Sequence, residues 1–223
     1  ELNNNTVTVT IENKKIKEFD LSLRKYISNV EGKTPTIDTS KLNTVNEETG
    51  KIIETAFYAH KKEATEVKTG DKITYNISVY NEGEVNGLVT AIIDYLPEGL
   101  EFDIANNTEF IELKNEYTDD ELVGKKYAYT FDNTTRELRI LPIEGGEYLF
   151  EVTAFNGENL DSKSIEIVCT VTATTENADK VLTNIATMEY KPSDTSEMAK
   201  DAFDNITDDI IEHYLYPLQC YKL

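Results

Sequence analysis

The chain has 223 residues, of which 39% are apolar and 29% charged, and its formal net charge is −20. This length and apolar content suit one large globular domain or two small ones, and they exclude a fully disordered chain. The negative charge, with no cluster of Lys and Arg longer than a pair, excludes a phosphate-binding surface for nucleic acid and disfavours binding to an anionic membrane. No apolar run reaches the roughly 18 residues of a membrane-spanning helix, so we expect no membrane insertion.

Apolar and polar residues alternate along most of the chain, which predicts half-buried β-strands. In chain order, the residues expected to point inward are Val7, Val9 and Ile11, then Phe19, Leu21, Leu23, Lys25 and Ile27, then Ile73, Tyr75, Ile77 and Val79, then Ile165, Ile167, Cys169, Val171 and Ala173, and finally Leu182, Asn184, Ala186, Met188 and Tyr190. Turns rich in Gly, Asn and Asp separate these strands. The pattern predicts an all-β protein, an antiparallel β-sandwich with long inserted connections.

Two less regular stretches, 28–56 and 103–126, are predicted to be these long connections, carrying short strands or a helical turn. Thr118 to Glu121 has the residues of a helix-capping box. The expected organisation is an N-terminal strand or linker over 1–16, the sandwich domain over 17–191 and an acidic tail or linker over 192–223. The chain starts at Glu1 instead of Met, which indicates a fragment of a longer protein.

Three polar residues interrupt the apolar rows. Lys25 shares the parity of Leu23 and Ile27, and Asn184 shares that of its apolar neighbours on the last strand. Asp94 has the parity of Ile92 and Leu96, in a run that is apolar on both faces. Because a buried Lys or amide is rare unless it has a polar partner, these residues are predicted to meet in the core. For one such residue alone, a side chain that reaches out to solvent or a β-bulge is the commoner explanation.

A buried Lys, Asn and carboxylic acid can react with one another. Burial lowers the pKa of an amine and raises that of an acid, by roughly 3 to 5 units when burial is complete. A proton can therefore reside on Asp94 and leave Lys25 as a neutral amine that attacks the side-chain carbonyl of Asn184. The predicted product is an amide cross-link between Lys25 and Asn184, formed with Asp94 as proton shuttle and with no cofactor.

Several blocks resemble one family of surface domains. They are KEFDLSLRKYI at 17–27, VKTGDKITY at 67–75, VYNEGEVNG at 79–87, DYLPEGL at 94–100 and TNIA at 183–186. Together they resemble the fimbrial isopeptide-forming domains of pilins and adhesins on clostridial and related Gram-positive bacteria. The family's acidic segment with Ser-Thr-Pro has no counterpart here, because residues 200–205 read KDAFDN.

The resemblance implies an immunoglobulin-like sandwich with the reactive Lys on the first strand, at Lys25, and the Asn on the last, at Asn184. It implies Asp94 as the assisting acid. It also implies a structural stalk or adhesin module on the bacterial cell surface or cell wall. Expected partners are neighbouring domains of the same surface protein and a host or matrix ligand.

Two other functions remain open from the sequence. An enzyme with turnover is disfavoured because His60 and His213 show no metal-ligand spacing and no nucleophile motif, so we expect no metal site. A carbohydrate- or protein-binding adhesin without the cross-link is the alternative, with Asp201, Asp204, Asp208 and Asp209 as a Ca²⁺ group, although a solvated linker explains this acidic group better. Pairing of Cys169 with Cys220 is also left open.

Overall fold

The computed structural model describes residues 17–33, 44–45, 52–54, 65–143, 145–157, 160–172, 181–194 and 220–222. The whole expected N-terminal linker, with its predicted strand around Val7 to Ile11, and most of the expected acidic tail lie outside these residues. The domain limits predicted from the sequence therefore stay predictions.

The first sheet has the strand order β1-β5-β12-β7, and all its pairings are antiparallel. Its strands are β1 (Leu21–Val30), β5 (Lys72–Asn81), β12 (Ser162–Val171) and β7 (Leu100–Phe102). The three long strands carry the alternation seen in the sequence, with β-branched and other apolar side chains on the buried face. Lys25 of β1 is opposite Ile77 of β5, which is in turn opposite Ile165 of β12.

The second sheet is built around β6 (Gly87–Tyr95). β14 (Ile185–Pro192) pairs with β6 along almost its whole length, while β11 (Phe150–Val152) pairs with its first part and β10 (Glu137–Pro142) with its last part. β9 (Tyr127–Asp132) pairs with β10, and β8 (Phe110–Glu112) pairs with β9. The β8–β9 pairing is parallel, unlike the other pairings of this sheet.

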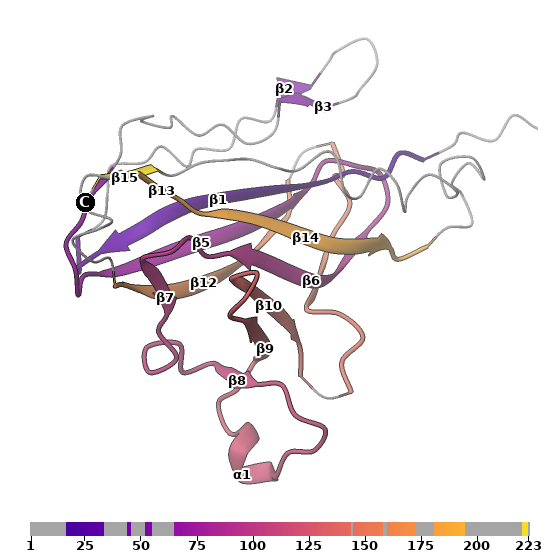
Figure 1. Cartoon of the computed structure of the whole chain (residues 1–223). Coiled ribbons are helices and arrows are strands. Elements are labelled where there is room, and N and C mark those ends of the chain that lie inside the picture. Colours follow the sequence, from indigo (N-terminus) through magenta and orange to yellow (C-terminus); the bar gives the residue numbers. More distant parts are fainter. Residues whose placement is uncertain are drawn as a thin grey trace, which may run out of the picture.

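Smaller elements lie outside the two main sheets. β13 (Val181–Thr183), β15 (Cys220–Lys222) and β4 (Thr65–Glu66) form a three-stranded sheet, and β2 (Thr44–Val45) pairs with β3 (Ile52–Glu54). The long connection between β7 and β9 carries β8 and the helix α1 (Asp119–Leu122), which project away from the sandwich (Figure 1). The predicted capping box is confirmed, because Thr118 and Glu121 satisfy each other's backbone N–H groups.

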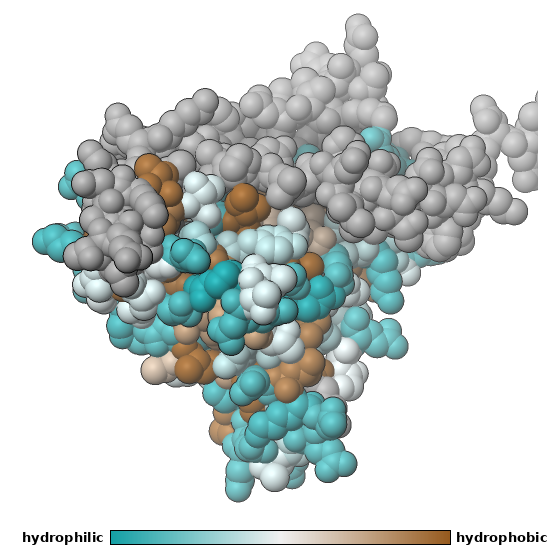
Figure 2. Space-filling view, in the orientation of Figure 1, coloured by the Kyte–Doolittle hydropathy of each residue, from teal (hydrophilic) through white to brown (hydrophobic). Residues whose placement is uncertain are grey.

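One hydrophobic core lies between the two main sheets. Its buried members include Leu21, Leu23, Ile27, Ile73, Ile77, Ile92, Leu138, Ile140, Ile165, Ile167 and Met188. The predicted all-β sandwich is therefore confirmed, in a mainly antiparallel form with long inserted connections. Hydrophobic and hydrophilic residues are interspersed on the visible face, and the projecting end around α1 is largely hydrophilic (Figure 2).

Candidate functional site: a buried amine, acid and amide

Lys25 enters the core from the first sheet. It lies in the middle of β1, and its inward-facing neighbours Leu23 and Ile27 are each 1% exposed. Lys25 itself is 8% exposed, so its side chain does not reach out to solvent. Its inward direction follows from the alternation of the strand.

Asp94 faces Lys25 from the second sheet. It is the penultimate residue of β6, opposite Leu138 of β10 and Ala186 of β14, and it has no exposed surface. The Lys25 Nζ donates a hydrogen bond to Asp94 Oδ1 at 2.5 Å, which makes a buried ion pair between the sheets. Asp94 Oδ2 is buried and has no hydrogen-bond partner among the described residues.

Asn184 lies at the break between β13 and β14, where the sequence predicted one continuous strand from Leu182 to Tyr190. The next residue, Ile185, pairs with Tyr95, the residue after Asp94. Asn184 is 1% exposed, and neither its Nδ2 nor its Oδ1 has a hydrogen-bond partner in the described part of the chain. A buried amide that lacks both partners is costly, by roughly 1–3 kcal/mol per polar group.

Burial and mutual attraction act in opposite directions on the pKa values of this site. Burial lowers the pKa of Lys25, although its attraction to Asp94 and its hydrogen bond to Asp94 counteract the shift. Burial raises the pKa of Asp94, while Lys25 and the neighbouring Asn184 amide favour the ionised form. The amide thus lies beside Asp94 but outside hydrogen-bond geometry. Both burial effects favour moving the proton from the amine to the acid.

Sequence reasoning missed two neighbours of the pair. The Lys25 Nζ lies 4.4 Å from the centre of the Tyr75 ring, and Tyr75 is 1% exposed on the adjacent strand β5. Cys169 of β12 is fully buried and close enough for Lys25 and Asp94 to affect its thiol, whose pKa is raised mainly by burial. Both residues have inward parity, which was the available signal. Parity shows which face of the sheet a Lys side chain points to, but it does not show which neighbouring residues that side chain reaches.

Most other groups predicted from the sequence lie outside the described residues. No group of His, Cys, Asp and Glu that could hold a metal ion occurs among the described residues. His60, His213 and the Asp201 to Asp209 group lie outside them, as does the side chain of Cys220. Cys169 is a free, buried cysteine, so the structure does not show its pairing with Cys220. In the described part of the chain, no helix has the length and apolar character needed to cross a membrane.

Comparison with known proteins gives a limited result. No family model matches the chain. No curated protein matches it either. Among solved structures, the chain is similar to the collagen-binding domain of a Staphylococcus aureus adhesin, with 18% sequence identity and a TM-score of 0.30. This match covers 57% of the chain and 81% of the adhesin domain.

Proposed function

We propose that the chain is a structural stalk or adhesin module of a bacterial cell-surface protein and that it forms an intramolecular amide bond between Lys25 and Asn184. One observation carries the proposal. An amine and a carboxyl group form an ion pair in the closed core, and an amide with no hydrogen-bond partner among the described residues lies beside the carboxyl group. A core that served only for packing would have apolar residues at these positions, because buried ion pairs add little stability.

The reaction begins with a proton transfer inside the ion pair. Lys25 Nζ gives a proton to Asp94, which leaves a neutral amine and a neutral acid. Oδ2 of Asp94 has no hydrogen-bond partner among the described residues, so the acid has an oxygen available for the Asn184 carbonyl. A protonated acid donates a hydrogen bond to that carbonyl oxygen and makes the carbonyl carbon more electrophilic.

The bond-forming step then balances without an oxidant or cofactor. Nζ of Lys25 attacks Cγ of Asn184, a new C–N bond forms, and the carbonyl oxygen takes the proton from Asp94. Asp94 then removes a proton from the attacking nitrogen and delivers it to Nδ2 of Asn184. The Cγ–Nδ2 bond breaks and ammonia leaves, and the oxygen returns its proton to Asp94 as the carbonyl is restored. The chain reacts once and is its own substrate, so it is not an enzyme with turnover.

The position of the bond suits a load-bearing role. Lys25 belongs to the first sheet, and Asn184 immediately precedes the strand that pairs with β6 of the second. A covalent link there would hold the two sheets together and join the first long strand to the last. It would resist shear and proteolysis, to which a module outside the cell is exposed.

The intact mass of the purified protein tests the proposal. The wild-type chain is expected to weigh less than its sequence mass by one ammonia. Lys25→Ala and Asn184→Ala are each expected to restore the full mass of their own sequence. Peptide mapping should find the residues around 25 and 184 in one branched fragment.

A surface variant provides the matched control. Lys163 lies on β12 with an exposed side chain, so Lys163→Ala removes a lysine of the same sheet without touching the core. This variant should keep the deficit of one ammonia. A folded wild-type protein with its full sequence mass would contradict the proposed bond.

A further inference from the structure

Arg136 lies at a tight turn that does not favour its backbone conformation. It is the last residue of the β9–β10 turn and directly precedes β10, with a φ of +60°. Glycine and asparagine adopt this left-handed region readily, whereas other residues do so at a cost in free energy. In a non-glycine residue, interactions with the surrounding structure must offset this cost.

The side chain of Arg136 reaches the segment that connects the two sheets. That segment runs from Leu96, which follows β6, to Leu100, the first residue of β7. The guanidinium donates hydrogen bonds from Nε to Leu96 O at 3.4 Å and from Nη2 to Leu100 O. Nη1 also forms an ion pair with Glu101 of β7 at 2.9 Å. Arg136 therefore ties the second sheet to a strand of the first.

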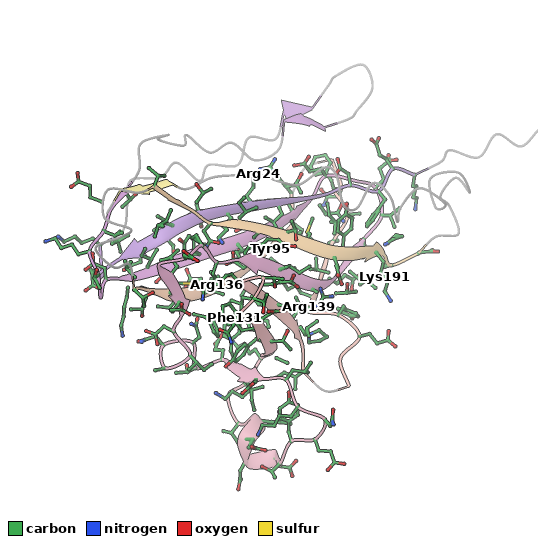
Figure 3. All side chains as sticks on the ribbon, viewed as in Figure 1. Arg24, Tyr95, Phe131, Arg136, Arg139 and Lys191 are labelled. Carbon is green, nitrogen blue, oxygen red and sulfur yellow. The ribbon has the colours of Figure 1, made fainter. Side chains whose placement is uncertain are left out.

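Two further contacts fix this arrangement. The backbone O of Arg136 accepts a hydrogen bond from Leu96 N at 2.9 Å, which continues the β6–β10 pairing past its last residue pair. The guanidinium also lies 5.2 Å from the centre of the Phe131 ring. Figure 3 shows Arg136 and Phe131 below β14 and near Tyr95, which follows Asp94 in the chain. Both the backbone and the side chain of Arg136 are thus held in place.

We infer that Arg136 is a positioning residue for bond formation, because it fixes the separation of the sheets next to Asp94. Leu96 is two residues from Asp94 on β6, and Arg136 is two residues from Leu138, the partner of Asp94 on β10. Lys25 reaches Asp94 only across the gap between the sheets. A loss of this tie would loosen the contact between Lys25 and Asp94 without removing a reacting group. This inference rests on the proposed function.

The test compares two arginines of the same neighbourhood. Arg136→Asn keeps a residue that suits the left-handed backbone but cannot reach Leu100. Arg139→Asn is the matched control: Arg139 lies on β10 and pairs with Glu189 of β14 at 2.5 Å, within the second sheet only. Each chain is made by cell-free synthesis, samples are quenched over time, and the fraction that has lost ammonia is measured by mass.

Arg136→Asn is expected to slow bond formation by about tenfold or more, since small displacements of reacting groups are costly. It should also narrow the pH range over which the bond forms by roughly half a pH unit. In a looser ion pair the pKa values of the two groups lie closer together, so the pair carries a single proton over a narrower range of pH. In the described part of the chain, the titratable side chains around the Lys25–Asp94 pair include Tyr75 from β5 and Cys169 from β12, and neither variant changes them. Arg139→Asn should change the rate by less than about twofold and keep the pH range.

A second measurement separates this inference from the proposed bond. In the Asn184→Ala chain no bond can form, and the Asp94 carboxyl can be titrated by carbon NMR. Arg136→Asn should raise the pKa of Asp94 in this background, and Arg139→Asn should not. If wild type shows no ammonia loss, the proposed function fails and the titration alone decides the role of Arg136. Equal rates and equal titrations for the two arginine variants would overturn the role of Arg136.

Discussion

At the scale of single residues, Lys25 places a charged amine in the core, where it needs an oppositely charged partner. Its side chain is 6% exposed, and the carboxylate that meets it, on Asp94, has no exposed surface. Removing one member of a buried pair leaves the other uncompensated and is typically costly, by about 3–5 kcal/mol. Substitutions that test the chemistry must therefore keep the shape of the site and change as little charge as possible.

Asp94→Asn is the sharpest residue-level change. The variant has nearly the same shape but cannot accept the proton from Lys25, so the amine stays charged and unreactive. We expect ammonia loss to slow by about 10²–10⁴-fold, the usual contribution of a general acid–base. The measurement is the fraction of cross-linked chain over time by intact mass. A rate equal to that of wild type would exclude Asp94 as the proton shuttle.

The pH dependence of bond formation should be bell-shaped. The reactive form carries one proton on the Lys25–Asp94 pair, so acid stops the reaction by protonating both groups and alkali stops it by removing the last proton. The acid limb should lie above the usual range of an Asp, because burial raises the pKa of Asp94, and the alkaline limb below that of a free Lys, because burial lowers the pKa of Lys25. Initial rates from pH jumps of newly made chain would measure this. A rate that rises steadily with pH would contradict it.

The burial of the three polar core residues could be predicted from the sequence because strand alternation is a local property. Lys25, Asp94 and Asn184 all have inward parity, and all three are buried. The contacts of Tyr75 and Cys169 could not be predicted in the same way. They depend on which strands are neighbours and on how a long side chain leans, and neither property is encoded within one strand.

At the scale of elements, the turn between β5 and β6 brings residues 18–21, which lead into β1, against the second sheet. Asn81 at the end of β5 is fully buried, and its amide donates to Val85 O at 2.8 Å and to Val152 O at 2.9 Å. Gly83 and Gly87 allow close approach of the segment 18–21. The sequence indicates a turn at Asn81-Glu82-Gly83, but it does not show which segment packs on that turn.

Gly87→Ala should destabilise this junction. A Cβ at position 87 would lie 2.6 Å from Leu21 Cδ1, and Leu21 is fully buried. We expect a loss of about 1–3 kcal/mol in the free energy of unfolding, as for other overpacked cores. Denaturant unfolding should be measured in the Asn184→Ala background, where no cross-link contributes.

A double-mutant cycle checks that the clash is with Leu21. Leu21→Ala makes room for the new methyl group, so the cost of Gly87→Ala should fall to less than about 1 kcal/mol in the Leu21→Ala chain. An unchanged cost would mean that the alanine acts through the backbone alone.

At the scale of the whole molecule, the proposed bond would close a loop of roughly 160 residues, for which chain entropy gives about 5 kcal/mol. This is comparable with the total stability of many domains. Among the described residues, the two main sheets meet through packed side chains, short connections, the Lys25–Asp94 ion pair and ties such as Arg136. A covalent link between them is therefore expected to dominate resistance to unfolding.

Comparison of wild type with Asn184→Ala measures this contribution. The variant cannot form the bond and keeps Lys25 as the charged partner of Asp94, whereas Lys25 of the cross-linked chain is an uncharged amide. The difference therefore reports the net effect of replacing the ion pair with the cross-link. We expect the wild-type chain to be more stable by about 5 kcal/mol, with a clearly higher guanidinium midpoint. Equal midpoints for a wild-type sample that lacks one ammonia would show that the bond does not stabilise the fold.

The place of the proposed bond, between the two sheets, has a consequence for biosynthesis. Lys25 and Asn184 are far apart in the sequence and come together only when both sheets have packed. A chain that misfolds, or that stops folding early, would not form the bond and would keep the Asn184 amide group. The mass of each molecule would then show whether it had ever reached its native structure. This mass could be measured even after the chain is denatured.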